Sequence, residues 1–299
     1  MTGWRMRSLQ NTGSCKAILI ETFLFQYVLV LLATGLAVGF FCGLLGVGGG
    51  FLMVPVQIWA LSSSGVDPTL ATRIAFGTSL AVVLPTALSG CRGHSCQGAV
   101  LWRPGIIMGL SGLIGAFFGG SIAAIAPGDL LRMLFGFVVL LGAMRMLFAG
   151  SLRLGQEDYP AEAKNGILKY VLWGLGAGVV SGLTGIGGGV ILVPVMVIAM
   201  GFSIYQAIGT SSITIAFNAA GGIIAYVING WGVSGLPDYC LGYIDLLQFA
   251  LLAGSSIFAA SWGVKAAHGL PAEKLRYIFV ILMIYIGLKM TGILGWIGL

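Results

Sequence analysis

The chain has 299 residues, of which 58% are hydrophobic and only 8% are charged, and its mean hydropathy is +1.02. An ordinary soluble domain carries about 25% charged residues, so this composition excludes a soluble globular protein. A net charge of +6 is typical of the cytoplasmic loops of membrane proteins, and we expect no nucleic acid as a partner. We therefore predict an all-α polytopic membrane protein, because a surface that faces the lipid bilayer should itself be apolar.

The first 21 residues form a basic tail that contains Arg5, Arg7 and Lys16. This tail resembles the start of a signal peptide. However, the apolar stretch that follows is too long and has no small-residue cleavage site at the expected distance. We therefore expect a retained first span, starting at residue 22, in a multi-pass protein of the cell (inner) membrane.

Apolar segments recur along the chain, and a spanning helix needs about 20 apolar residues. The candidates, in chain order, are 22–44, 50–62, 74–90, 105–125, 130–149, 168–184, 188–201, 207–229, 243–264 and 274–296. Segments 50–62 and 188–201 are too short to cross the bilayer at about 1.5 Å per residue, so we expect half-helices there. The polar stretches between the spans leave no room for a soluble catalytic domain.

The chain contains an internal repeat. The segment Gly43-LLGVGGGFLMV-Pro55 returns 139 residues later as Gly182-LTGIGGGVILV-Pro194. Gly77-Thr78-Ser79 returns as Gly209-Thr210-Ser211 at an offset of 132. Insertions in polar loops, with constant spacing inside the spans, indicate a duplication.

Further along, the offset becomes 144, as in the match of Gly98 with Gly242 and of Arg145 with Lys289. We predict two homologous halves with broken helices at their Gly-rich motifs. The divisions are a tail at 1–21, a first transmembrane repeat at 22–150, a cytoplasmic linker at 151–167 and a second repeat at 168–299.

Regularly spaced glycines precede both copies of the motif. They are Gly35, Gly39 and Gly43 in the first half and Gly174, Gly178 and Gly182 in the second. Residues four apart share one face of a helix, and small residues there let two membrane helices approach closely. We interpret these six glycines as helix-packing residues.

Two denser glycine runs follow, Gly46-Val-Gly48-Gly49-Gly50 and Gly185-Ile-Gly187-Gly188-Gly189. Three consecutive glycines break a helix, and the backbone groups released in the bilayer need partners. A helix that restarts at Phe51 or Val190 would direct unpaired N–H groups and a positive dipole end toward the break, which suits an anion. Carriers place such paired broken helices around a central substrate site, although a kink that serves only packing is the alternative. Neither run fits a nucleotide-binding fingerprint.

Other polar residues lie near these breaks. Threonine and serine hydroxyls can coordinate an oxyanion, but in membrane helices they often bond their own backbone. Arg73 is the cation that we expect to attract an anion, and its repeat counterpart is uncharged. The candidate substrate-binding residues are Gly46, Gly48, Gly49, Gly50, Arg73, Thr78, Ser79, Gly185, Gly187, Gly188, Gly189, Thr210, Ser211 and Asn218.

The sequence contains few residues that could carry out catalysis or bind a metal or a cofactor. Cys91-Arg-Gly-His94-Ser-Cys96 could be drawn as a metal loop, but no second Cys/His pair completes four ligands. The only other histidine is His268, so an intramembrane enzyme would lack a nucleophile–base pair or a metal cluster. We expect no metal, no cofactor and no enzymatic activity.

The tandem boxes G-x-x-G-x-G-G-G-x-x-x-x-P, each followed by G-T-S, resemble the TauE/SafE sulfite exporter family, and so does Gly242-Tyr-Ile-Asp245. The likeness covers about residues 28–297. It implies a carrier with about eight spans in two related halves, and substrates such as sulfite, sulfonates, thiosulfate-like or other organic anions. Gly98-Ala-Val-Leu101 lacks the aspartate of the second copy, so any role of Asp245 need not be duplicated.

We therefore expect a secondary transporter that moves a small anion across the cytoplasmic membrane by alternating access. The anion would be sulfite, a sulfonate or a related sulfur oxyanion. An anion channel, or a carrier of non-sulfur organic anions, is the alternative, and coupling to protons or to the membrane potential stays open. Five crossings per half would give inverted repeats and four would give parallel ones. The sequence makes no prediction of transport direction or oligomeric state.

Overall fold

A computed structural model describes residues 25–44, 48–148, 166–266 and 272–293, and these are almost entirely helical. The elements are a first helix Phe25–Leu44, α2 Gly50–Ser63, α3 Pro68–Ser95, α4 Trp102–Ile125, α5 Gly128–Phe148, α6 Ile167–Thr184, α7 Gly189–Ile198, α8 Ile204–Gly230, β1 Cys240–Leu241, β2 Ile244–Asp245, α9 Leu246–Ala266 and α10 Ala272–Met290. Within these described residues, six helices are long and apolar enough to cross a membrane. The prediction of an all-α polytopic membrane protein is confirmed.

Polar residues mark where several helices begin. The Asp67 side chain accepts N–H groups of the first turn of α3, and Pro68 takes the first helical position, where no N–H is needed. Ser203 and Gln206 form a reciprocal capping box at the start of α8. Asp245 caps the N-terminus of α9, because its Oδ1 accepts hydrogen bonds from the N–H groups of Leu247 and Gln248.

Side-chain contacts define the directions of the central helices. The α3 and α9 helices run parallel, since Thr86 meets Ser256 and Gly93 meets Val264. The α3 and α8 helices run antiparallel, since Gly77 lies against Tyr226 and further along α3 Gly90 lies near Ser212. We call the two ends of the bundle the Asp245 end, where α3 and α9 begin, and the His94 end, where α3 finishes and α8 begins.

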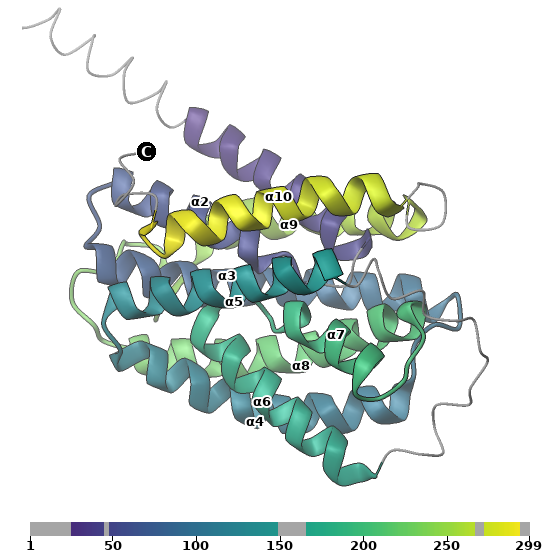
Figure 1. Cartoon of the computed structure of the whole chain (residues 1–299). Coiled ribbons are helices and arrows are strands. Elements are labelled where there is room, and N and C mark those ends of the chain that lie inside the picture. The colour runs from purple at the N-terminus through teal and green to yellow at the C-terminus, as the bar shows by residue number, and fades with distance from the viewer. Residues whose placement is uncertain (1–24, 45–47, 149–165, 267–271, 294–299) are drawn as a thin grey trace, which may run out of the picture.

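Most of the helices lie side by side along one common direction, while the first helix and α6 run obliquely to them (Figure 1). The α9 and α10 helices lie on one side, α4 and α6 on the other, and α3, α5 and α8 between them. The α3 helix is the most enclosed of the six candidate spans, with 78% of its apolar window buried. Large apolar side chains such as Phe118, Leu172 and Phe258 are exposed on the outer helices, as a lipid-facing surface requires.

The helices α2 and α7 are short, with 14 and 10 residues. Each begins in the middle of the bundle, because Gly48 and Gly187, which precede the two helices, both lie beside Val83, and the two helices run to opposite ends. The α2 helix reaches the Asp245 end, where Asp67 starts α3, and α7 reaches the His94 end, where Ser203 starts α8. The prediction of two half-helices is confirmed.

The six regularly spaced glycines pack against backbone. In the first helix, Gly35 lies against Leu252, Gly39 against Ser256 and Gly43 against Ala260; in α6, Gly174 lies against Met108, Gly178 against Gly112 and Gly182 against Ala116. The packing role predicted for them is therefore confirmed. The two sets of contacts are related by the offsets 139 and 144 seen in the sequence. Each glycine face contacts a helix of the other predicted repeat, α9 in one case and α4 in the other.

Helices that the sequence offsets pair with each other run in opposite directions. This holds for α3 and α8, and also for α5 and α10, where Gly136 lies against Thr291 and Leu140 against Gly287. These directions are the ones required by five crossings per half with inverted repeats. They disagree with the parallel repeats of a four-plus-four scheme. The division at 22–150, 151–167 and 168–299 itself stays a prediction.

Candidate substrate site

The first glycine run interrupts the chain between the first helix and α2. Gly46 lies in 45–47, outside the described residues. Gly48 and Gly49 have φ angles of +83° and +67°, in the left-handed region that glycine adopts without a steric penalty. The α2 helix then begins at Gly50, one residue before the predicted restart at Phe51.

The second glycine run has the same form. Gly185 ends α6 with φ +68°, and Gly187 and Gly188 have φ angles of +90° and +85°. The α7 helix begins at Gly189, again one residue before the predicted position. No side chain caps the N-terminus of either α2 or α7 within the described residues, so no side-chain acceptor is hydrogen-bonded at the positive ends of these two helix dipoles.

The two breaks contact each other. A Cβ placed on Gly48 would lie 3.2 Å from the carbonyl oxygen of Ile186, and one on Gly50 would lie 2.7 Å from that of Gly185. The side chains of Val83 on α3 and Ile215 on α8 border both Gly48 and Gly187. Gly49 instead faces Val38 of the first helix. The structure thus brings Gly48, Gly50, Gly185 and Gly187 together in the middle of the bundle.

Two buried polar side chains adjoin the second break. Asn218 and Ser181 are fully buried, and neither amide atom of Asn218 nor the Ser181 hydroxyl has a hydrogen-bond partner among the described residues. A Cβ placed on Gly188 would lie 3.1 Å from Asn218 Nδ2 and 3.4 Å from Ser181 Cβ. Both side chains therefore lie at the N-terminus of α7.

Ser181 is not among the residues predicted from the sequence, because it does not recur in both repeats. The residue that pairs with Ser181 at the offset of 139 is Cys42. A hydroxyl inside the glycine face, one position before Gly182, was the available signal.

The predicted hydroxyl groups have backbone partners. Thr78 Oγ1 accepts the N–H of Asp245 at 2.9 Å, and Thr210 Oγ1 accepts the N–H of Leu101 at 3.0 Å. These two threonines thus fasten the segments that precede α9 and α4. Ser79 donates to the carbonyl oxygen of Gly185 at 2.9 Å and holds the second break against α3. Ser211 donates to Ile208 of its own helix at 2.9 Å, the local bonding that the sequence left open.

Arg73 does not lie at the breaks. Its guanidinium donates to the carbonyl oxygen of Ala126 at 3.0 Å and to the Tyr243 hydroxyl at 3.4 Å. It lies near the Asp245 end, about three helical turns, or roughly 15 Å, from Val83 along α3. Its positive charge faces the C-terminus of α4, where a cation is favourable.

Asp245 adjoins the same end of the bundle. Its side chain is 6% exposed, and burial raises the pKa of its carboxyl group, while the N–H groups of Gln248 and Leu247 oppose that shift. The carboxyl group acts as the N-cap of α9. Its counterpart in the other repeat is Leu101, so this cap occurs once.

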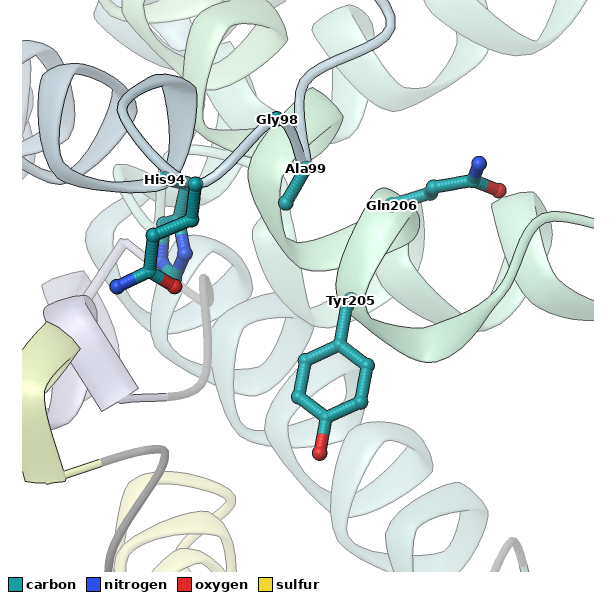
Figure 2. Close-up of a pocket in the computed structure, with 6 residues that line it drawn as sticks. His94, Gly98, Ala99, Tyr205 and Gln206 are labelled. Atoms are coloured by element: carbon teal, nitrogen blue, oxygen red, sulfur yellow. The ribbon is translucent and has the colours of Figure 1, made fainter.

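A cavity of about 380 Å³ opens at the His94 end. Figure 2 shows His94 of α3, Gly98 and Ala99 of the following loop, and Tyr205 of α8 around it. A His94 ring nitrogen lies 3.2 Å from the carbonyl oxygen of Gly43, at the end of the first helix. From this cavity α3 and α8 lead to Gly90 and Ser212, which are neighbours, and then to Val83 and Ile215 at the breaks.

No group of three His, Cys, Asp or Glu side chains within the described parts of the chain could hold a metal ion. Cys91 is buried and Cys96 is exposed, and both are free thiols.

Comparison with known proteins identifies the family. The family model described as Sulfite exporter TauE/SafE matches residues 31–290. A probable membrane transporter protein of Haemophilus influenzae is 28% identical over 89% of this chain and 99% of its own length. Another, of Methanocaldococcus jannaschii, is 26% identical over 92% of this chain and 96% of its own. No solved structure matches. The chain belongs to the TauE/SafE sulfite exporter family and is a multi-pass membrane transporter.

Proposed function

We propose that this transporter is a secondary carrier that moves a small anion by alternating access around the two glycine breaks. The observation that carries the proposal is their contact: Gly48 and Gly187 both adjoin Val83 and Ile215 in the middle of the bundle. Inverted half-helices that meet at mid-depth are the arrangement in which carriers bind substrate. In addition to Gly48 and Gly187, we place Gly50, Ser79, Gly185, Gly188, Gly189 and Asn218 in the proposed site. The other residues predicted from the sequence, Gly46, Gly49, Thr78, Thr210 and Ser211, are proposed to support it from the adjoining backbone and helices.

An anion suits this site for a physical reason. The N-termini of α2 and α7 both begin at the breaks, and neither has a side-chain cap among the described residues. Exposed N–H donors and two positive dipole ends favour negative charge. Sulfite, a sulfonate or a related sulfur oxyanion is the substrate we propose, and the family description supports this choice.

Charge at the two ends of the bundle indicates its orientation. The His94 end carries a row of basic residues at helix termini, Arg92, Arg103, Arg145, Lys169 and Lys265. The Asp245 end carries Asp67, Asp129 and Asp238 with fewer basic groups. Since basic residues collect in the cytoplasm, we assign the His94 end and the 151–167 linker to that side.

With this orientation, the cavity between His94 and Tyr205 is a cytoplasmic vestibule. The opposite end is closed where Tyr243 packs against Gly77 and Tyr226 and receives the hydrogen bond from Arg73. Arg73 therefore acts in closing the outer end, and not as a ligand of bound substrate. Alternating access would exchange the open and closed ends.

The test is a flux panel in proteoliposomes with sulfite, sulfate, thiosulfate, taurine and simple carboxylates. Gly48→Val and Gly188→Val should abolish saturable uptake while the protein still inserts and purifies as a folded species. Gly176→Val is the matched control, because no described atom lies within 4 Å of a Cβ there. Normal uptake by both break variants would refute the site.

Two other results would redirect the proposal. A conductance that does not saturate with anion concentration would identify a channel. Saturable flux of carboxylates alone would show that the substrate contains no sulfur.

A further inference from the structure

The two breaks differ in the hydrogen bonding of their buried polar groups. At the first break, the Thr86 hydroxyl lies 2.7 Å from the Ser256 hydroxyl, and the Cys42 thiol contacts the N–H of Gly48. At the second break, the corresponding residues are Asn218 and Ser181, at the offsets of 132 and 139. Their polar atoms have no partner among the described residues.

The geometry around Asn218 explains this difference. The residue that corresponds to Ser256, at the offset of 144, is Gly112, and the Asn218 side chain packs against it. Ser256 of α9 gives Thr86 a hydroxyl partner at the first break, whereas Gly112 of α4 places no side chain that could bond Asn218 at the second. The amide nitrogen is left directed at Gly188, the N-cap of α7. A buried amide without partners costs about 1–3 kcal/mol, which a bound ligand can recover.

We propose that the N-terminus of α7, Asn218 and Ser181 form the anion-binding half of the site and that this half selects monovalent oxyanions. This inference rests on the proposed function and specifies the charge of its substrate. The ligand's oxygens accept hydrogen bonds from the Asn218 amide, the Ser181 hydroxyl and the first backbone N–H groups of α7.

The selectivity for a single charge follows from the absence of cations. The α7 and α8 helices contain no charged residue at all. The neighbouring helices α4 and α6 contain only Arg103 and Lys169, which lie near their starts at the His94 end. The α5 helix also contacts α7, through Gly142 and Val190, and carries Arg145 three residues beyond Gly142, but the Arg145 side chain is exposed and does not face the break. The cost of desolvating an ion grows with the square of its charge, whereas its attraction to neutral dipoles grows only linearly. A dianion therefore loses more than it gains in this site.

Methanesulfonate and sulfate test the proposal, because they are tetrahedral anions of similar size with one and two charges. Calorimetric titration of the purified full chain should show methanesulfonate binding at least about tenfold more tightly than sulfate, a difference of about 1.4 kcal/mol. Asn218→Leu should weaken methanesulfonate binding about tenfold, and Ser181→Ala should weaken it severalfold. Ser181→Ala removes one oxygen atom and keeps the test decisive if Asn218→Leu does not fold.

Thr86→Val is the matched control, since it removes a buried hydroxyl at the equivalent position of the first repeat. It should leave methanesulfonate affinity within about twofold. Sulfate binding as tight as methanesulfonate, no methanesulfonate binding, or unchanged affinity in folded Ser181→Ala would each overturn the inference. Sulfite flux in proteoliposomes is measured separately. Flux that is lost in Gly188→Val but unchanged in Ser181→Ala would preserve the carrier and reject this subsite.

Discussion

Replacing Gly188 by alanine tests whether this position requires glycine only for its left-handed backbone conformation, or also because neighbouring atoms leave no space for a Cβ. Gly188 has φ +85°, and a left-handed conformation costs a residue with a Cβ about 1–2 kcal/mol. The new Cβ would also lie 3.1 Å from Asn218 Nδ2 and 3.2 Å from the Ala177 carbonyl oxygen. Crowding of this kind in a packed core costs about 1–3 kcal/mol. We therefore expect Gly188→Ala to lower the free energy of unfolding by about 2–5 kcal/mol.

The chain contains a matched control for the backbone contribution. Gly65, in the loop before α3, has φ +83°, and no described atom lies within 4 Å of a Cβ there. Gly65→Ala should therefore cost only the conformational part, about 1–2 kcal/mol. The entropy that alanine removes from the unfolded chain is common to both variants and cancels.

The measurement is chemical unfolding of both variants in lipid–detergent micelles, together with sulfite flux in proteoliposomes. Gly188→Ala should be the less stable of the two by about 1–3 kcal/mol and should lose flux, while Gly65→Ala keeps it. Equal losses of stability in the two variants would refute the close packing of Gly188 against Asn218 and Ala177.

Three further predictions concern the two ends of the bundle. Thr78→Val leaves the N–H of Asp245 without its hydrogen-bond acceptor, and Thr210→Val leaves the N–H of Leu101 without its acceptor. Each variant should therefore lower the free energy of unfolding by about 1–3 kcal/mol. No measurable loss of stability would mean that another group accepts these N–H bonds. Burial raises the pKa of Asp245 above its ordinary value of 3.8, so its stabilising contribution is complete below pH 3.8 and is lost as pH rises through the folded-state pKa. The Tm of the wild type should therefore fall relative to that of Asp245→Asn over this rise, and parallel Tm curves would contradict the shift. Cys96 is exposed at the His94 end, so as the only cysteine it should react with a membrane-impermeant maleimide from the cytoplasmic side, whereas Asp238→Cys should react from outside; the reverse pattern would overturn the orientation.

The broken helices and the glycine packing faces could be predicted from the sequence because both depend on glycine itself. A run such as Gly187-Gly188-Gly189 interrupts a helix wherever it occurs in a bilayer. In the structure α7 begins only one residue before the predicted position. The spacing of Gly174, Gly178 and Gly182 likewise defines a smooth face, but it does not say which helix covers that face. The partner, α4, belongs to the other predicted repeat, and only the three-dimensional contacts reveal it.

The polar part of the site was harder to predict, because a hydroxyl or a guanidinium group can form its hydrogen bonds with several different partners. Thr78 and Thr210 recur in both repeats because each fastens a loop to its neighbouring helix, which is a role in folding. Arg73 lies on α3, the helix that borders both breaks, but its side chain extends to Ala126 and Tyr243, away from the breaks. Ser181, which does adjoin the second break, differs between the repeats, so the repeat pattern does not predict it.

Each glycine face packs against a helix of the other predicted repeat, and this limits how a carrier of this fold can move. The first helix contacts α9 and α6 contacts α4 through close backbone approaches, and each pair joins the two predicted repeats. A rigid rotation of one repeat against the other would break both contacts at once, at a loss of the packing that holds membrane helices together. A rotation of the first helix with α9 against α4 with α6 would leave both contacts intact. Such a movement would change the distance between α3, which packs on α9, and α8, which packs on α4, and these are the two helices that border both breaks.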